Sequence, residues 1–314
     1  MNIKKFNFGI GINVFFLMVA CSSPQPVPQS VQNVSAPKFS EKIEKVYAQN
    51  CAQCHGENRT GLTGPALMPE TLGKLKNSDL VAVLKNGRVA TQMPGFAAQL
   101  DDKEIQDMIN FVKSPVISDL TWTQQDIEKS TIQSENRMVV KPAFNSDPWN
   151  LFFVVAHGEH ELFIFDGDKF EILKTFHMRP GLHGGVKYTR NGKLAFTTTR
   201  DGWITKFDVH GLKKMAEVRV GINTRNIAIS EDGKYLMAGN LTPRNLVILD
   251  VGTLKPLYVQ NLNYLDNQLS RAGAVYSAPP RKSFIVALKD ASEVWEIKIT
   301  NKGLKIAKTS TPEP

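Results

Sequence analysis

The spacing of apolar residues divides the chain into a helical part and a β-rich part. Between residues 38 and 115, apolar side chains recur three and four positions apart, the period of one helix face. Ser40 and Ser78 are placed to cap two helices, and Asp101 with Glu104 has the spacing of a capping box for a third. The apolar positions of that third helix are Ile105, Met108, Ile109 and Val112. This part therefore predicts a small all-α domain of three helices.

Beyond about Met138 the pattern changes to short β runs that repeat. Three runs end in aspartates 42 residues apart, at Asp166, Asp208 and Asp250, and a fourth unit spans residues 284–297. Gly192 and Gly233 recur 41 apart between runs, as expected for hairpin turns that need a positive φ. A period near 40 with four strands per unit predicts about four propeller blades. A β-sandwich is the alternative, whereas the missing 3.6-residue spacing argues against a helical solenoid.

The sequence Cys51-Ala52-Gln53-Cys54-His55 has the spacing by which a c-type haem is attached. Two thiols three positions apart can each bond one vinyl group of the macrocycle, and the following imidazole can take an axial position on the iron. A zinc site would need two more ligands, and the chain holds one other cysteine. We therefore expect covalent haem c, with His55 as an iron ligand and single-electron transfer as its chemistry.

Two Met-Pro pairs compete for the second axial position. Met93-Pro94-Gly95-Phe96 resembles the M-P-x-F-type loop that precedes the last helix in class I cytochromes c, and that resemblance favours Met93. Met68 is then read as a core side chain, the usual role of methionine. Imidazole with thioether favours ferrous iron and leaves no position for a substrate, as in an electron carrier.

The N-terminus has the pattern of an exported bacterial lipoprotein. A basic start of five residues precedes an apolar run of 15, which is too short to span a bilayer and ends at Ala20-Cys21. We expect cleavage after residue 20, acylation of Cys21 and attachment on the periplasmic side of the cell envelope, at the inner or the outer membrane. Every cysteine then has a role, so no structural disulfide is expected.

Composition completes the division of the chain. We expect a signal peptide at 1–20, a proline-rich tether at 21–37, a cytochrome c domain at 38–115, a linker at 116–145 and a partial propeller at 146–314. The formal charge is +8, but the basic residues are scattered and form no aromatic-lined cluster, which argues against a nucleic-acid partner.

The β-rich part resembles the d1-type propeller of the cytochrome-cd nitrite reductases and of their relatives in haem d1 assembly, the dihydro-haem d1 dehydrogenases among them. The segments that carry this resemblance are Gly181-Leu182-His183-Gly184-Gly185, Thr199-Arg200-Asp201-Gly202, Val220-Gly221-Ile222-Asn223-Thr224-Arg225 and Ala238-Gly239-Asn240-Leu241-Thr242-Pro243. The resemblance implies that His183 ligates a d1 iron and that Arg200 and Arg225 pair with acidic substituents of the macrocycle. His157 and His160 are three positions apart, and on one strand they would face opposite sides, which argues against a shared metal.

The chain differs from that family in one respect. The propellers of that family have eight blades, and only four repeats are present in this chain. The ring would be truncated, or completed by another chain. The distal histidines that assist nitrite reduction would lie in the missing half.

Three functions follow. The first is d1 binding with electron transfer in haem d1 maturation and denitrification. The second is an oxidoreductase, either a nitrite reductase or a fragment of one. The third is an anchored electron-transfer cytochrome with a protein-docking β domain. Expected partners are a redox protein, the membrane through the lipid, and another propeller half or a nitrite reductase.

Overall fold

The computed structural model describes residues 39–310 with short gaps, at 74, 90, 117–119, 135–136, 157, 183–184 and 265–267. The signal peptide, the tether and Cys21 lie outside the described residues. All described residues fall within one compact unit of the chain. In this part of the chain, no helix has the length and apolar character needed to cross a bilayer.

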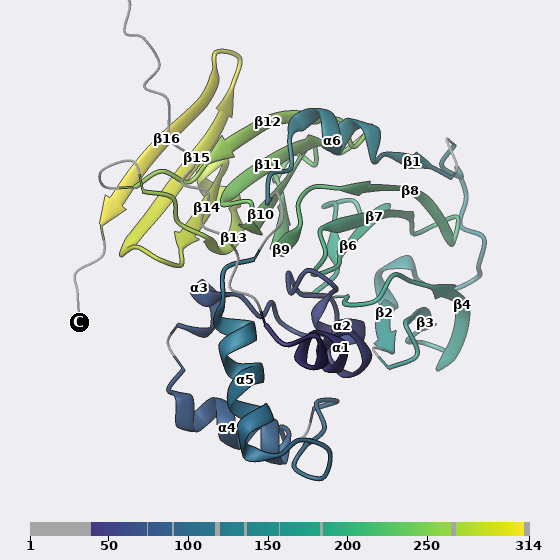
Figure 1. The fold of residues 1–314 in the computed structure, drawn as a ribbon. Helices are drawn as coiled ribbons and strands as arrows, with labels where there is room; N and C mark the ends of the chain where they lie inside the picture. The colour runs from purple at the N-terminus through teal and green to yellow at the C-terminus, as the bar shows by residue number, and fades with distance from the viewer. Residues whose placement is uncertain are drawn as a thin grey trace, which may run out of the picture. The chain divides into compact units, whose positions relative to one another are not determined.

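Five helices occur among the described residues of the predicted cytochrome c domain (Figure 1). They are α1 (Glu41–Asn50), α2 (Ala52–His55), α3 (Pro69–Leu72), α4 (Asn77–Asn86) and α5 (Asp102–Lys113). The three long helices were predicted. Helices α2 and α3 are single turns, which are too short to show a helical spacing of apolar residues. The apolar faces of α1 and α5 meet in one core that includes Ile43, Tyr47, Ile105 and Ile109.

Local capping signals set most of the helix ends. The carboxylate of Asp101 accepts a hydrogen bond from the Glu104 N–H (2.8 Å), and the Glu104 carboxylate accepts one from the Asp101 N–H (3.0 Å). The predicted capping box is therefore confirmed, as is the cap at Ser40. The cap predicted at Ser78 is wrong. Helix α4 begins at Asn77 and its cap is Lys76, two residues before Ser78, because the Asp79 carboxylate accepts from the backbone N–H of Lys76.

The β-rich part forms four sheets of antiparallel strands (Figure 1). The first holds β2 (Leu151–Ala156), β3 (Glu161–Asp166) and β4 (Glu171–His177). The second holds β5 (Lys187–Tyr188), β6 (Leu194–Thr198), β7 (Trp203–Asp208) and β8 (Lys213–Arg219), with β1 (Ile132–Gln133) beside β8. The third holds β9 (Asn223–Ile229), β10 (Tyr235–Thr242), β11 (Asn245–Asp250) and β12 (Pro256–Asn261). The fourth holds β13 (Ala272–Ala278), β14 (Ser283–Leu288), β15 (Glu293–Thr300) and β16 (Gly303–Ser310).

Alternation along the strands packs these sheets face to face. In β10, Leu236 joins the core shared with the second sheet, and the next residue, Met237, joins the core shared with the fourth. In β11, Val247 likewise packs in the core shared with the second sheet, and Ile248 in the core shared with the fourth. Successive side chains of a strand point to opposite faces, so the third sheet is buried on both sides. Four consecutive sheets packed in this manner are propeller blades, which confirms the predicted fold class and removes the sandwich alternative.

Two features differ from a regular set of blades. The first sheet has three strands where four were expected, and β2 pairs with β3 alone among the described residues. The segment predicted as a linker is partly folded. It contributes helix α6 (Gln124–Lys129), whose Ile127 is buried in the core between the second and third sheets, and strand β1.

Candidate haem c centre and propeller site

Helix α2 places the three residues of the attachment motif together. The N–H groups of Cys54 and His55 donate to the carbonyl of Cys51 at 3.1 and 2.9 Å, so both thiols and the imidazole follow one turn of chain. Cys51 and Cys54 are not joined by a disulfide, and both are half-buried. Gly56, with φ at 78°, ends the turn. This arrangement suits two thioether bonds to one macrocycle with an axial nitrogen beside them.

The imidazole of His55 is oriented by the segment that follows it. Its Nδ1 lies 2.7 Å from the carbonyl oxygen of Pro65, and because a carbonyl can only accept, Nδ1 carries the proton. That tautomer leaves Nε2 unprotonated for a metal. A Cβ added to Gly64 would lie 2.8 Å from Nδ1 and Cε1 of His55, so a side chain there would displace the ring. The residues present therefore fit a c-type haem, with Cys51, Cys54 and His55 holding it.

Burial shifts the pKa of two groups in this motif. Burial lowers the pKa of His55 from its usual value, although the hydrogen bond to Pro65 opposes the shift. Burial, with a smaller contribution from Cys54, raises the pKa of the Cys51 thiol to about 11. Within the described ranges, no three His, Cys, Asp or Glu side chains gather to hold a metal ion. A zinc site on Cys51 and Cys54 therefore has no further ligands among these residues.

The two methionines lie in different surroundings. Met68 is 2% exposed and directly precedes α3, as expected of a core side chain. Met93 is half-buried in the loop between α4 and α5, where its carbonyl accepts from the Arg88 N–H at 3.1 Å. Phe96, three residues on, donates to the carbonyl of Leu84 at 2.8 Å and fixes the loop against α4. Met93 as the iron ligand stays a prediction.

A residue that the sequence analysis missed ties the haem segment to the last helix. Arg59 is buried, and its guanidinium donates to the carbonyls of Phe111, Ser114 (3.1 Å) and Pro115 (3.0 Å) at the end of α5. The guanidinium carbon also lies 4.7 Å from the centre of the Phe111 ring. These partners are more than 50 positions away, so nothing local to Arg59 could reveal the role.

The predicted arginines of the propeller site lie together. Arg200 is in the turn between β6 and β7, and Arg225 is the third residue of β9. Burial lowers the pKa of Arg200, and the positive charge of Arg225 lowers it further. Among the described residues no carboxylate pairs with the Arg200 guanidinium. Two adjacent, partly buried cations suit a ligand with carboxylate groups.

His183 lies outside the described residues, but the chain just before it is described. The backbone N–H of Arg200 donates to the carbonyl of Gly181 at 2.8 Å, and Leu182 forms a bridge with Thr199. The segment leading to His183 therefore lies against the turn that carries Arg200. Ligation by His183 stays a prediction.

The remaining histidines carry no metal site in the part of the chain that the structure describes. His160 lies in the turn between β2 and β3 with φ at 57°, not on a strand, and His157 lies outside the described residues. His160 is therefore not positioned by a strand, and the absence of a metal shared with His157 stays a prediction.

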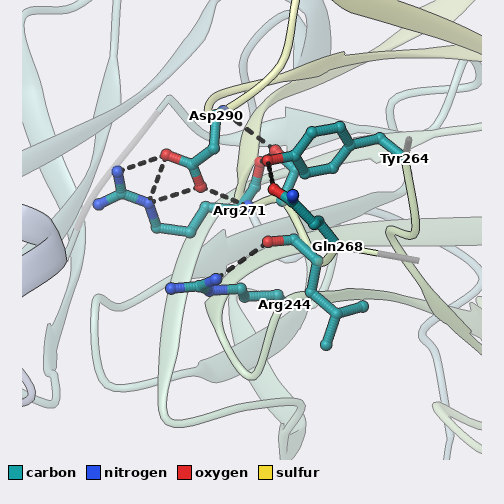
Figure 2. Close-up of polar contacts among 7 residues, drawn as sticks. Arg244, Tyr264, Gln268, Arg271 and Asp290 are labelled. Carbon is teal, nitrogen blue, oxygen red and sulfur yellow. Dashed lines mark hydrogen bonds and ion pairs between the residues drawn. The ribbon is translucent and has the colours of Figure 1, made fainter. Parts of the chain in front are cut away.

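A second polar cluster is formed by the third and fourth blades (Figure 2). Its residues Arg244 and Asp290 lie in the turns that correspond to the Arg200 turn of the second blade. Arg271 is buried and forms a bidentate ion pair with Asp290, with nitrogen to oxygen distances of 2.6 to 3.1 Å. Asp290 also accepts from the Arg271 N–H, and its own N–H donates to Ser270. Nearby, Arg244 donates to the carbonyl of Leu269 at 3.0 Å. These contacts fix the chain between β12 and β13, and sequence spacing gave no sign of the pairing.

This fold and these residues define a c-type cytochrome joined to a d1-type propeller. Residues 146–313, more than half of the chain, match the family described as cytochrome D1 heme domain, and the chain belongs to it. Residues 40–112 match the family of cbb3-type cytochrome c oxidase subunit III, a cytochrome c domain.

The chain is similar to several characterised proteins. It is 44% identical over 260 residues to dihydro-heme d1 dehydrogenase of Pseudomonas aeruginosa, covering 82% of this chain and 53% of the relative. It is 25% identical over 317 residues to nitrite reductase of Stutzerimonas stutzeri, covering 90% of this chain and 55% of the relative. A solved structure of dihydro-heme d1 dehydrogenase NirN in complex with DHE matches with a TM-score of 0.68 and 42% identity, covering 85% of this chain and 58% of that one. The chain thus spans about half the length of these relatives.

Proposed function

We propose that this chain binds a dihydro-haem d1 type of tetrapyrrole and carries electrons from it through haem c. The observation that carries the proposal is the position of the haem c segment beside the Arg200 turn. A Cβ added to Gly181, whose carbonyl accepts from Arg200, would lie 2.6 Å from the carbonyl oxygen of Leu62. Leu62 lies seven residues after His55. One loop therefore connects the two predicted cofactor sites.

The chemistry is that of a dehydrogenation. Removing two hydrogens from a saturated bond releases two electrons and two protons, and a c-type haem accepts one electron at a time. Arg200 and Arg225 would hold the acidic substituents of the tetrapyrrole, and His55 with the predicted Met93 would hold the haem c iron. The electrons would leave to a redox protein, and the protons to solvent.

The experiment is a titration of the full-length holocytochrome with dihydro-haem d1 under anaerobic conditions. We expect a new long-wavelength absorption band and reduction of two ferric haems c for each tetrapyrrole oxidised, because each haem accepts one electron. A chain that shows no new band would be an electron-transfer cytochrome with a docking domain, contrary to the proposal. Turnover of nitrite with a reduced dye would instead support the nitrite reductase alternative, which the 25% identity to nitrite reductase keeps open.

We further propose that the protein acts on the periplasmic side of the envelope, anchored through acylated Cys21. Support comes from the basic start, the apolar run and Ala20-Cys21 in the sequence. Cys21→Ser should move the protein from the membrane fraction to the soluble fraction without loss of covalent haem. Wild-type protein in the soluble fraction would contradict the anchor.

A further inference from the structure

The loop that follows the haem c motif, residues 60–64, is bound to the motif by backbone hydrogen bonds. The N–H of Gly61 donates to the carbonyl of His55 at 2.9 Å, and the N–H of Gly64 donates to that of Cys54 at 2.7 Å. Gly61 has φ at 93°, a conformation open mainly to glycine. A displacement of this loop would therefore be transmitted to the backbone of the two haem-binding residues.

One propeller side chain contacts this loop. Asn223, the first residue of β9, is 1% exposed, and its Nδ2 donates to the carbonyl oxygen of Thr60 at 2.6 Å. Thr60 is the sole hydrogen-bond partner of the Asn223 side chain among the described residues, and the Asn223 Oδ1 is buried without one. Among the described residues, this amide therefore makes no hydrogen bond within the propeller.

The backbone around Asn223 is held rigidly. The hydroxyl of Thr224 donates to Oδ1 of Asn240, and Nδ2 of Asn240 donates to the carbonyl of Val220 and to Oδ1 of Asn245, all at 2.7 to 2.9 Å. Thr224, Asn240 and Asn245 are all buried. A fully hydrogen-bonded buried network specifies one geometry, so the Asn223 amide is presented in a fixed position.

The same backbone reaches the arginine turn. The N–H of Thr224 donates to the carbonyl of Arg200 at 2.9 Å, and the N–H of Arg200 donates to Gly181. A continuous path thus runs from His55 through Gly61, Thr60, Asn223 and Thr224 to Arg200.

We propose that Asn223 is a positioning residue that fixes the haem c loop against the propeller and thereby sets the environment of His55. The inference needs only the attached haem c, so it does not depend on tetrapyrrole binding. In this proposal the hydrogen-bond donor at residue 223 is essential for holding the loop, whereas the volume of the side chain is not.

The test uses full-length holocytochrome with Asn223→Leu and Asn223→Ala. Leucine has about the shape of asparagine but has no proton to donate, so it removes the hydrogen bond at this buried site without burying a charge. We expect hydrogen exchange in the peptide covering residues 56–67 to rise about tenfold, the equivalent of one hydrogen bond. We also expect the midpoint potential of haem c to shift in both variants, while hydrogen exchange in the propeller strands rises less than in this peptide.

Asn226→Ala is the matched control, because Asn226 lies on the same strand and its side chain bonds only to the Val275 backbone within the described propeller. It should leave exchange of the 56–67 peptide and the haem potential unchanged. The proposal is overturned if both Asn223 variants keep the wild-type exchange rate and haem potential. It is also overturned if Asn226→Ala changes these two quantities as much as they do. If neither Asn223 variant folds, hydrogen exchange of the Asn223 side-chain amide is measured in the wild-type protein. Slow exchange supports the bond to Thr60, and exchange at the rate of an exposed amide overturns it.

Discussion

The imidazole of His55 and the carbonyl group of Pro65 are joined by a hydrogen bond of 2.7 Å across ten residues of chain. Gly64, between them, leaves just enough room for the ring. This pair selects the tautomer, so the orientation of the predicted iron ligand is set by the neighbouring backbone.

Gly64→Ala should disturb this arrangement, because the added Cβ would lie 2.8 Å from the His55 ring. We expect a lower yield of covalent haem, a shifted midpoint potential and an altered Soret band. Spectroscopy and potentiometry of the purified variant provide the measurement. Gly185→Ala is the control, since nothing lies within 4 Å of the added carbon. An unchanged spectrum for Gly64→Ala would contradict the assigned role of the Pro65 segment.

If Met93 is the sixth iron ligand, as predicted, Met93→Ala should remove it. The expected result is loss of the charge-transfer absorption band of thioether-ligated ferric haem, with a lower midpoint potential. Met68→Leu is the control, because a volume-conserving change at this buried site should cost less than about 1.5 kcal/mol and retain the band. If Met68→Leu instead loses the band, the assignment of the two methionines is reversed.

Arg59→Ala should destabilise the cytochrome c domain. The substitution leaves three carbonyl groups at the end of α5 without this donor, at a cost of about 2–3 kcal/mol. Denaturant unfolding followed by haem absorbance measures the loss. Arg88→Ala changes an exposed side chain and should stay within about 0.5 kcal/mol of wild type. Equal stability of the two variants would show that Arg59 does not hold the helix end.

Acid stability should depend on the pair formed by Arg271 and Asp290. Burial alone would raise the pKa of Asp290, but the hydrogen bonds and charge of Arg271 outweigh it and hold that pKa below its usual value. The contribution to stability is therefore complete above the unfolded pKa of about 3.9 and is lost as pH falls through the folded value. Asp290→Asn should be less stable than wild type at pH 7 and should lose less stability on acidification.

The measurement is the free energy of unfolding as a function of pH. At pH 7 the cost should fall below the roughly 3–5 kcal/mol of a fully buried pair, because the Asp290 side chain stays 24% exposed. Asp107→Asn changes a surface carboxylate and should follow the wild-type curve. Parallel pH curves for wild type and Asp290→Asn would contradict the role of the pair.

Arg200→Ala and Arg225→Ala should each weaken binding of an acidic tetrapyrrole by about 10- to 100-fold, as expected for one charge-assisted contact. Removing Arg200 also removes a like charge next to Arg225, so we expect no loss of stability from that variant. Spectroscopic titration and thermal unfolding separate the two effects. Arg190→Ala, in the turn between β5 and β6 at the opposite end of the blade, is the control and should bind normally. Equal affinity of all three variants would exclude Arg200 and Arg225 from the site.

Features that depend on neighbouring residues were predictable from the sequence. The capping box of Asp101 and Glu104 spans four positions, and the hairpin glycines Gly192 and Gly233 have φ of 67° and 69° because each closes a local turn. Cys51, Cys54 and His55 share one helical turn for the same reason.

Features that join distant segments were not predictable. Ile127 appeared to belong to a polar linker, but it enters a core completed by strands that begin some 70 residues later. Arg59 and Asn223 likewise owe their roles to partners that only the folded chain brings near. No periodicity or local motif encodes such contacts, because they depend on the packing of whole elements.

The pairing of β1 with β8 has a consequence for the order of events during folding. Every other strand pair in the described sheets joins strands that are adjacent in the chain, and each can form as soon as its hairpin emerges. Ile132 must wait for Glu217. The cytochrome c domain precedes both strands in the chain, so it can fold before the blades are complete, and β1 then completes the second blade.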